Sequence, residues 1–398
     1  MPRLTHDRIT WLTYAQLGVW GFFLYGFGPV VPLLRDEQDT SAAVASLHST
    51  SLAVGALIGG FLFPVLARRI GRGRTLWLSL AGIAVGAAAL SILRPLPATL
   101  TAVVVAATFG TMAVCGVNTA LTEHHRAAAP AAISEANAAC AGMGILAPIV
   151  IGLAVGAGIG WRPALAVEVG LIALVALAAV VFRVRLPQGT TAAAAAGSRS
   201  GRLPRAYWIA WALMGLTGSI EVCLSLWSAD VLRSHAGMSP GGASAALSSI
   251  VGGMFLGRLV GGRIALRVAP VPLLLAALTV SMVGFLVFWA SPIGWIAVGG
   301  LTILGLGNAM HYPLAISIAL AAAQGQADRA AGYSSYSMAV GFGIAPVVLG
   351  WVADGVGPHL AFLILPGFIV VAALLVLRLG RLLRPHPTAP SPATPARV

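Results

Sequence analysis

Two short segments of this chain are similar to each other. Residues 145–152 read ILAPIVIG and residues 343–350 read GIAPVVLG, so the shared Pro148 and Pro346 lie 198 positions apart. At the same spacing, LARRI at 66–70 corresponds to IALRV at 264–268 in a chain of 398 residues. One half of the chain is therefore a diverged copy of the other, which requires a fold built from two similar halves.

The composition is that of a membrane protein. Hydrophobic residues make up 58% of the chain, charged residues 9%, and the mean hydropathy is +0.92. Soluble proteins carry about 25% charged residues, so two soluble domains of this length would lack a polar surface. An apolar chain with an internal duplication is typical of secondary transporters, whose halves move around a shared site near the bilayer midplane.

About twelve apolar stretches are long enough to cross a bilayer as helices, which takes about 20 residues each. They show no strict alternation, which favours helices over the strands of a closed barrel. We therefore expect an all-α membrane protein with twelve transmembrane helices in two pseudo-symmetric six-helix halves. The stretches lie at 9–34, 41–66, 75–93, 97–123, 129–157, 161–182, 207–232, 241–265, 271–290, 293–322, 329–353 and 358–380.

The basic residues predict the orientation. All 24 are arginine, and 19 of them fall on one side of the membrane together with the N-terminus. Four fall on the other side, and Arg258 falls within a span; the four are Arg35, Arg94, Arg162 and Arg233. The positive-inside rule then places both termini in the cytosol, and we expect a multi-pass protein of the plasma membrane. The charge serves topology and contact with the lipid bilayer, so we expect no nucleic-acid partner.

The sequence divides into four parts. Residues 1–183 form an N-terminal six-helix half and residues 207–383 a C-terminal one. Between them, residues 184–206 are small, polar and basic, and we expect a flexible cytosolic linker. Residues 384–398 are rich in proline, and we expect a disordered tail.

Glu221 is the only acid that falls squarely in the middle of a predicted span. An ionisable group at the bilayer centre costs about 2.5–3.5 kcal/mol on insertion scales and is a functional candidate by default. At helical spacing Glu221 shares a face with Thr217, Ser225 and Ser228. We interpret Glu221 as a proton-coupling residue, with His311 as its partner or as an independent titrating site. A glutamate that only bonds neighbouring helices is the alternative.

Polar stripes on three further spans predict a shared cavity. The first span offers Gln16 and Trp20, the fourth carries Thr111 and Asn118, and the tenth carries Asn308, His311 and Tyr312 just before Pro313. Bonding between helices explains each residue separately. Together with the Glu221 stripe, these residues favour a substrate cavity lined by the first, fourth, seventh and tenth spans.

The loop after the second span, PVLARRIGRGR at 64–74, resembles the signature G-x-x-x-D-R-x-G-R-R/K of the major facilitator superfamily. Pro64 replaces its first glycine and Arg68 its acid. With the twelve spans and the long central loop, the resemblance covers the whole chain. It implies a cytosolic gate, which we assign to Arg69, Gly71, Arg72 and the repeat-related Arg267. Ala147-Pro148 and Gly152 partly match the glycine–proline signature of antiporters in the same family. The same pattern recurs around Pro346, so the alternative role of Pro148 and Pro346 is close helix packing and helix bending.

A narrower resemblance links GLGNAMHYP at 305–313 and GSIEV at 218–222 to fucose-permease-like sugar symporters. Those symporters carry acids in the first span and just before the asparagine of the fourth. This chain has no acid at either place, since Val114 stands four residues before Asn118.

No P-loop, catalytic triad or H-E-x-x-H sequence occurs in the chain, so we expect neither a primary pump nor an enzyme. We also expect no cofactor and no metal. The sequence predicts a monomeric secondary transporter that moves a small organic solute by alternating access, with protons as the coupling ion. The alternatives are proton-driven efflux of an apolar compound, uniport, and a membrane receptor that transports nothing.

Overall fold

The computed structural model describes residues 5–125, 129–184, 186, 202–265, 267–323 and 327–383. Most of the expected linker at 184–206 and the expected tail at 384–398 lie outside these residues.

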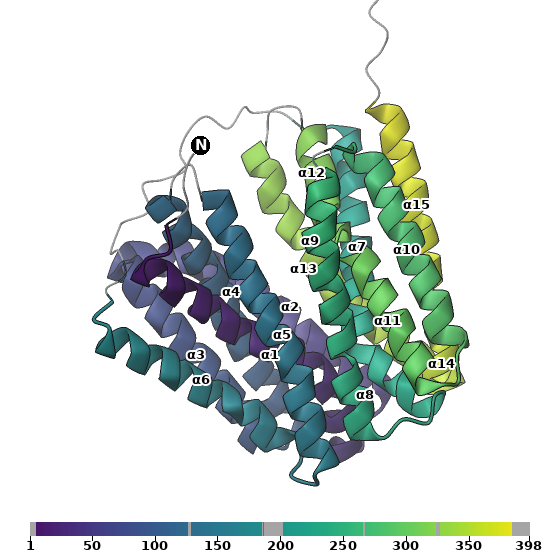
Figure 1. Cartoon of the computed structure of the whole chain (residues 1–398), viewed down its shortest axis with the longest axis horizontal. Coiled ribbons are helices and arrows are strands. Elements are labelled where there is room, and N and C mark those ends of the chain that lie inside the picture. The colour runs from purple at the N-terminus through teal and green to yellow at the C-terminus, as the bar shows by residue number, and fades with distance from the viewer. Residues whose placement is uncertain are drawn as a thin grey trace, which may run out of the picture.

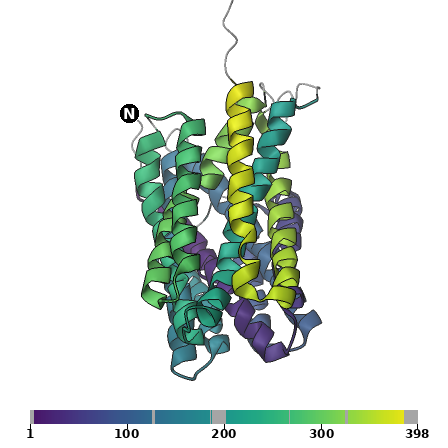
Figure 2. The same ribbon diagram turned by 90° about the vertical axis from the view of Figure 1, so that its right-hand side faces the viewer.

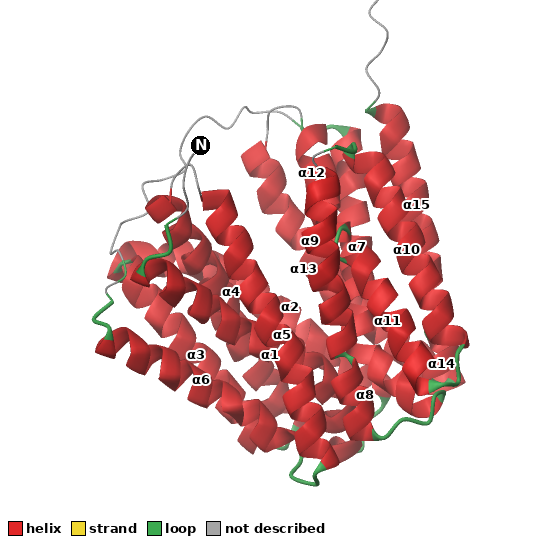
Figure 3. Ribbon diagram, in the orientation of Figure 1, coloured by secondary structure: helices red, strands yellow, loops and turns green. Residues whose placement is uncertain are grey.

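The described residues fold into helices with no strand (Figure 3). Twelve spans in this part of the chain are long and apolar enough to cross a membrane. The all-α prediction is thereby confirmed. The helices are α1 (Arg8–Gln38), α2 (Ala42–Ile70), α3 (Arg72–Ile92), α4 (Leu96–His125), α5 (Ala129–Gly156), α6 (Trp161–Val181), α7 (Arg205–Ser234), α8 (Pro240–Ala246), α9 (Ser248–Ala265), α10 (Pro270–Ala290), α11 (Gly294–Asn308), α12 (His311–Ala322), α13 (Ala327–Val356), α14 (Pro358–Ala361) and α15 (Ile364–Leu382).

The tenth predicted span is divided into α11 and α12. α11 ends at Asn308, and α12 begins at His311. Pro313 has no N–H to donate to the carbonyl of Ala309, so the continuous ladder is interrupted at this point. By contrast, Pro148 and Pro346 both lie inside continuous helices, α5 and α13.

The duplication is visible at the helix starts. Ser41 caps α2 by accepting a bond from the Val44 N–H, and Ser239 caps α8 by accepting one from the Gly242 N–H. The two serines are again 198 positions apart. A serine at this position satisfies an N–H group that the first turn of a helix leaves unpaired. Both copies have kept this local signal.

We refer to α1–α6 as the N-terminal half and to α7–α15 as the C-terminal half. The end of the molecule with residues 5–8, 183–184 and 202–205 is the linker end, and the end with residues 38–42 and 234–240 is the distal end. The ribbons of the halves converge at the distal end and lie apart at the linker end (Figure 1). Across the boundary, α2 packs along α13, and α5 packs along α8 and α9.

The outer faces of the bundle are apolar. Most helices run side by side between the linker end and the distal end (Figure 2). Their outward side chains include Phe61, which is 74% exposed, Leu174, which is 62% exposed, and Trp295, which is 77% exposed. Large exposed apolar groups all around a bundle are expected where lipid, rather than water, is the solvent.

Candidate functional site

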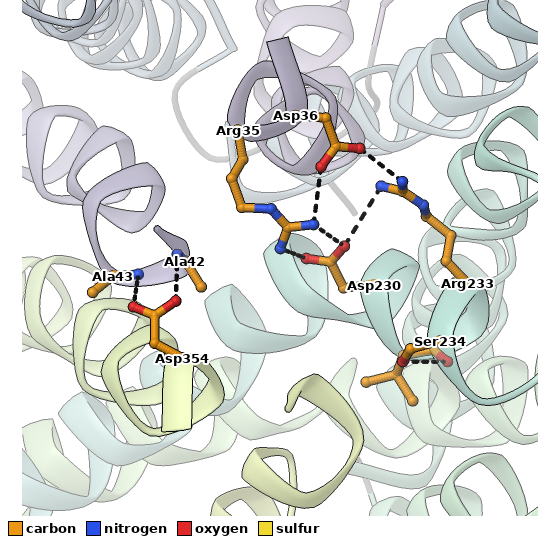
Figure 4. A network of polar contacts seen from close by, with 9 residues as sticks. Arg35, Asp36, Ala42, Ala43, Asp230, Arg233, Ser234 and Asp354 are labelled. Atoms are coloured by element: carbon orange, nitrogen blue, oxygen red, sulfur yellow. Dashed lines mark hydrogen bonds and ion pairs between the residues drawn. The ribbon is translucent and has the colours of Figure 1, made fainter. Parts of the chain in front are cut away.

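Charged residues join the two halves at the distal end (Figure 4). The Arg35 guanidinium on α1 donates two hydrogen bonds to the Asp230 carboxylate on α7, at 2.7 and 2.9 Å. Arg233 donates to Asp36 at 2.7 Å, and Arg35 also donates to Asp36 at 3.1 Å. The Asp230 side chain is only 5% exposed. Because the network is bidentate and partly buried, it is worth more than an ordinary surface pair.

A second carboxylate closes the same end by capping a helix of the other half. Asp354 at the end of α13 accepts hydrogen bonds from the N–H groups of Ala42 at 2.7 Å and Ala43 at 3.1 Å. These N–H groups begin α2, where the helix dipole also favours negative charge. The aspartate therefore holds α13 of the C-terminal half against α2 of the N-terminal half.

Glycines allow the helices to approach closely at this end. A Cβ on Gly350 of α13 would lie 2.8 Å from the carbonyl oxygen of Ala42, and one on Gly152 of α5 would lie 2.6 Å from that of Gly241. Gly152 and Gly350 belong to the repeated segments. The same close contact thus occurs twice, once on each side of the molecule.

Hydrogen bonds between α2 and α13 continue the closure toward the centre. The Ser49 hydroxyl donates to the carbonyl of Phe342, and the Thr50 hydroxyl donates to that of Gly343, both at 2.6 Å. At the linker end, in contrast, Arg69 and Arg267 are exposed, and neither belongs to an ion pair between described residues. The two halves are therefore bonded to each other at the distal end.

A cavity of about 120 Å³ lies beneath this closure, between α1, α2, α7 and α13. Glu221 and Ser225, two members of the predicted polar stripe, both line it, and the Ser225 hydroxyl donates to the Glu221 carbonyl at 3.1 Å. The lining residues are Leu24, Tyr25, Phe27, Gly28, Ser49, Leu52, Glu221, Val222, Ser225, Leu226 and Phe342.

Arg258 of α9 is the charged neighbour of Glu221. Its guanidinium is near enough to interact electrostatically with the Glu221 carboxylate and with the Tyr25 hydroxyl of α1. The ion pairs between described residues do not include a direct contact of Arg258 with Glu221. Arg258 itself is absent from the lining of the cavity. In the sequence, Arg258 is notable only as an arginine within a span.

His311 and Tyr312 point in different directions, because consecutive residues on a helix are about 100° apart. Tyr312 is 44% exposed and interacts electrostatically with Glu221. His311 is buried and hydrogen-bonds through Nε2 to the Ser281 hydroxyl of α10 at 3.1 Å. The structure therefore brings Tyr312, and not His311, to the Glu221 side of α12.

The remaining cavity candidates of the N-terminal half lie within that half. Gln16 is fully buried, and neither amide atom has a hydrogen-bond partner among the described residues. Trp20 stacks on Phe23 at 5.7 Å between ring centroids, and Thr111 packs against Gly59 of α2. Asn118 is partly buried on α4. These four side chains are absent from the lining of the cavity that holds Glu221.

Two candidates of the C-terminal half are likewise engaged with their own half. The Thr217 hydroxyl donates to the Met214 carbonyl at 2.9 Å. The Asn308 amide lies 3.8 Å from the sulfur of Met254 on α9. Both side chains are buried, at 1% and 2% exposure.

The loop between α2 and α3, to which we assigned the gate, contributes Arg72 to an ion pair that the sequence did not predict. Arg72 begins α3, is only 2% exposed, and pairs with the Glu123 carboxylate of α4. Gly71 before it has a φ of 85°, a backbone conformation that residues other than glycine rarely adopt. Arg72 thus fixes the loop within the N-terminal half, whereas Arg69 is exposed at the linker end.

Comparison with known proteins gives a consistent result. The family model described as Major Facilitator Superfamily matches residues 14–327 and again residues 222–398. No curated protein matches this chain in sequence. Among solved structures, a bacterial homolog to the human lysosomal transporter Spinster, in an inward-facing and occupied conformation, matches with a TM-score of 0.74. The identity is 14%, over 95% of this chain and 98% of that one.

Two further structures are similar in fold. A peptide transporter POT in complex with sulfate has a TM-score of 0.74 and 15% identity, covering 96% of each chain. A single-residue variant of the E. coli fucose:proton symporter, FucP, has a TM-score of 0.60 and 20% identity, over 93% of this chain and 98% of that one. At these identities the likeness concerns the fold alone.

Proposed function

Because the chain belongs to the major facilitator superfamily, whose members among its structural neighbours are membrane transporters and not enzymes, we propose that it is a proton-coupled secondary transporter of a small organic solute. The observation that carries the proposal is Glu221, an acid that lines a cavity between the halves together with Tyr25. Burying an acid within the membrane is costly, so such a residue is a functional candidate by default.

Alternating access requires the distal closure to open and the linker end to close. The bonds that must break are those of Arg35 with Asp230, Arg233 with Asp36, and Asp354 with the start of α2. We assign the opposite closure to Arg69 and Arg267, which bond helix-end carbonyls of the other half when the linker end is shut. The linker end is the cytosolic one in this proposal, and the protein works as a monomer in the plasma membrane.

We assign proton coupling to the change in charge of Glu221 near Arg258 and Tyr25. Arg258 acts on Glu221 within the C-terminal half and on Tyr25 across the boundary. When Glu221 takes up a proton, its attraction for Arg258 is lost, and the guanidinium interacts with Tyr25 alone. The protonation state of one residue thereby changes a contact that the two halves must remake during transport.

Efflux by proton exchange is the second candidate function, because the same residues serve either direction and the gradients decide between them. A cavity of about 120 Å³ favours a small solute over the larger drug-like compounds of exporters. Uniport and a non-transporting receptor need no proton-binding residue in the cavity, so an acid that lines it favours proton coupling over both.

The test is transport in proteoliposomes driven by an imposed pH gradient. Solutes that raise the melting temperature of the purified protein are selected first, since a ligand that binds only the folded state stabilises it. Glu221→Gln should abolish pH-driven accumulation while leaving exchange of solute across the membrane. Glu168→Gln is the matched control, because Glu168 is buried in α6 and its carboxylate has no hydrogen-bond partner among the described residues. Full pH-driven accumulation by Glu221→Gln would refute the coupling role.

A further inference from the structure

An open groove lies between α1 and α6 at the linker end, and its volume is about 600 Å³. Trp11 of α1 and Leu174 of α6 line it and are 61% and 62% exposed. Ala15 of α1 and Ala178 of α6 also line it. Because the side chains of these two alanines are single methyl groups, the helices leave room for an apolar ligand on the outer face of the bundle.

A second groove, of about 480 Å³, adjoins the first at the end of α6. Ala179 and Val184 line both grooves, and the second is also lined by Trp77 of α3 and by Arg183. The end of α6 therefore separates two apolar spaces, each of which is bordered by one tryptophan and one arginine.

The charge at these grooves is positive. Arg8 is the charged residue of the first groove and Arg183 that of the second, and no acidic residue of the described chain lines either one. The Arg8 guanidinium donates through Nη1 to the carbonyl of Phe182, the residue before Arg183, at 3.2 Å. A guanidinium has five N–H donors, so Arg8 can bond the end of α6 and still bind an anion.

The backbone at the end of α6 places an arginine where glycine is usual. The Arg183 N–H donates to the Val180 carbonyl at 3.1 Å, and the Val184 N–H donates to the Ala179 carbonyl at 2.9 Å. This pair of bonds ends many helices and usually has glycine at the left-handed position. Here Arg183 takes that position, with a φ of 52°. Since a side chain makes this conformation costly, its presence points to a role for the guanidinium.

The dimensions of the first groove match one leaflet of a bilayer. Tryptophan is enriched at the level of the lipid headgroups, and Trp11 and Trp77 border the two grooves. From Phe182 to Leu174, both of which line the first groove, a helix rises roughly 12 Å. Half of a hydrocarbon core of about 30 Å is roughly 15 Å. The groove therefore extends from the headgroup level into the apolar part of the leaflet.

We propose that this groove binds an anionic phospholipid. Arg8 and Arg183 hold its phosphate, and an acyl chain lies along α1 and α6 between Trp11 and Leu174. A guanidinium offers a planar set of donors that fits phosphate oxygens, and the apolar wall excludes water from the chain. A headgroup without a balancing positive charge fits best, because no acidic residue of the described chain lines the grooves.

The central segment of this chain is a poorer match for the groove. Residues 185–201 follow directly on Val184, but they contain arginine and no acidic residue. Their charge therefore repels Arg8 and Arg183, whereas that of an anionic lipid attracts them.

The first experiment measures lipid binding to the purified full-length protein by native mass spectrometry in detergent. The probes are phosphatidylglycerol and phosphatidylcholine with the same acyl chains. We expect the first phosphatidylglycerol to bind at least about tenfold more tightly than phosphatidylcholine. A large molar excess of glycerol 3-phosphate should not displace it. Equal affinity for the two lipids, or displacement by glycerol 3-phosphate, would overturn the inference.

Variants then locate the headgroup. Arg8→Gln/Arg183→Gln should weaken phosphatidylglycerol binding at least about tenfold, and Arg183→Gln alone, which keeps the bond of Arg8 to Phe182, by about fivefold. The matched control is Arg378→Gln/Arg381→Gln, which removes two exposed arginines of α15 at the same end of the molecule. An equal loss in both double variants would indicate general attraction by surface charge and refute the site.

A third pair of variants tests the groove itself. Ala15→Trp fills the groove without changing its charge and should weaken phosphatidylglycerol binding at least about tenfold, since it displaces the acyl chain. Ala173→Trp is the matched control, because Ala173 is exposed on α6 and lines neither groove. Unchanged binding in Ala15→Trp would show that the lipid does not occupy the groove. A dimer that dissociates in Ala15→Trp would assign the groove to a second copy, and tighter lipid binding after deletion of residues 190–199 would assign it to that segment; either result would overturn the inference.

Discussion

At the scale of single residues, Tyr25 of α1 lines the same cavity as Glu221 of α7. Replacing Tyr25 by Phe removes a hydroxyl that can bond a solute or a charged group there, and a hydrogen bond to a charged group is worth about 1.5–3 kcal/mol. We expect Tyr25→Phe to slow solute exchange by about tenfold or more. Tyr14→Phe is the matched control, because Tyr14 donates to Glu135 at 3.0 Å within the N-terminal half. Equal exchange rates in both variants would argue against a role for Tyr25.

Asp7 makes a pH-dependent contribution to stability outside the membrane spans. Partial burial raises the pKa of this carboxyl, but hydrogen bonds from the Thr10 N–H and hydroxyl and from His124 outweigh it, so the pKa is lowered. A lowered pKa in the folded state contributes stability at neutral pH that is lost as the pH falls through the unfolded and then the folded value. Because Asp7 caps α1, Asp7→Ala should cost about 1 kcal/mol at pH 7.

Thermal unfolding in detergent checks this prediction. The difference in melting temperature between the wild type and Asp7→Ala should shrink as the pH is lowered toward about 4, the unperturbed value for aspartate. A difference that stays constant with pH would show that the carboxylate charge is irrelevant at this cap.

The sequence could identify Glu221 because an acid in the middle of an apolar span can be recognised without a structure. It could not identify Arg258 as its neighbour, since that depends on how α9 packs in the folded chain. The same limit applies to His311, which lies one residue from Tyr312 in the sequence and bonds to Ser281 of α10 instead. Spacing along one helix predicts which side chains share a face, but packing decides what that face meets.

At the scale of helices, Asp354 is the contact that holds α13 against the start of α2. Asp354→Ala leaves two N–H groups at the start of α2 without their acceptor, and we expect the carrier to open at the distal end several-fold more often. A cysteine at Ser225, in a background without Cys115, Cys140 and Cys223, should then be labelled faster by an impermeant maleimide added from the distal side.

The control for this labelling is Arg94→Ala. Arg94 is 78% exposed at the same end and pairs with Glu37 of its own half at 3.8 Å, so its loss leaves the contact between the halves intact. Labelling that rises equally in both variants would indicate general loosening and not the release of a latch.

The linker end offers the opposite prediction. Arg69→Ala and Arg267→Ala should lower distal labelling and slow turnover more than they weaken binding, because each removes a cation that we assign to the closed linker end. Combining Arg69→Ala with Asp354→Ala should bring labelling back toward the wild-type rate. Solute exchange at the wild-type rate in both arginine variants would exclude these residues from the gate.

The positions of the spans could be predicted from the sequence, because twenty apolar residues have few alternatives to a helix in a bilayer. The break between Asn308 and His311 was signalled only by Pro313, three residues into the new helix. The pairing of Arg72 with Glu123 could not be predicted, since the two residues belong to different helices and neither lies on a recognisable polar stripe.

At the scale of the whole molecule, the two halves share residues that connect and cap helices, but they do not share the charged residues near the cavity. Arg35 and Arg233 are related by the repeat, as are Ser41 and Ser239, and both pairs lie at the distal end. The positions that correspond to Glu221 and Arg258 are Phe23 and Gly60. The charged pair therefore belongs to the C-terminal half alone, and the N-terminal half contributes Tyr25 and an apolar wall.

The orientation of the whole molecule is the last prediction. Arginines at the linker end outnumber those at the distal end by 19 to 4 in the sequence-based assignment, and cytosolic loops are the ones that retain positive charge during insertion. Reporter fusions at residue 195 and at the C-terminus should therefore read as cytosolic, and one at residue 37 as external. An external reading at residue 195 would contradict the division into six and six spans. A reversal of all three readings would keep the fold but place Asp354 and Asp230 at the cytosolic gate.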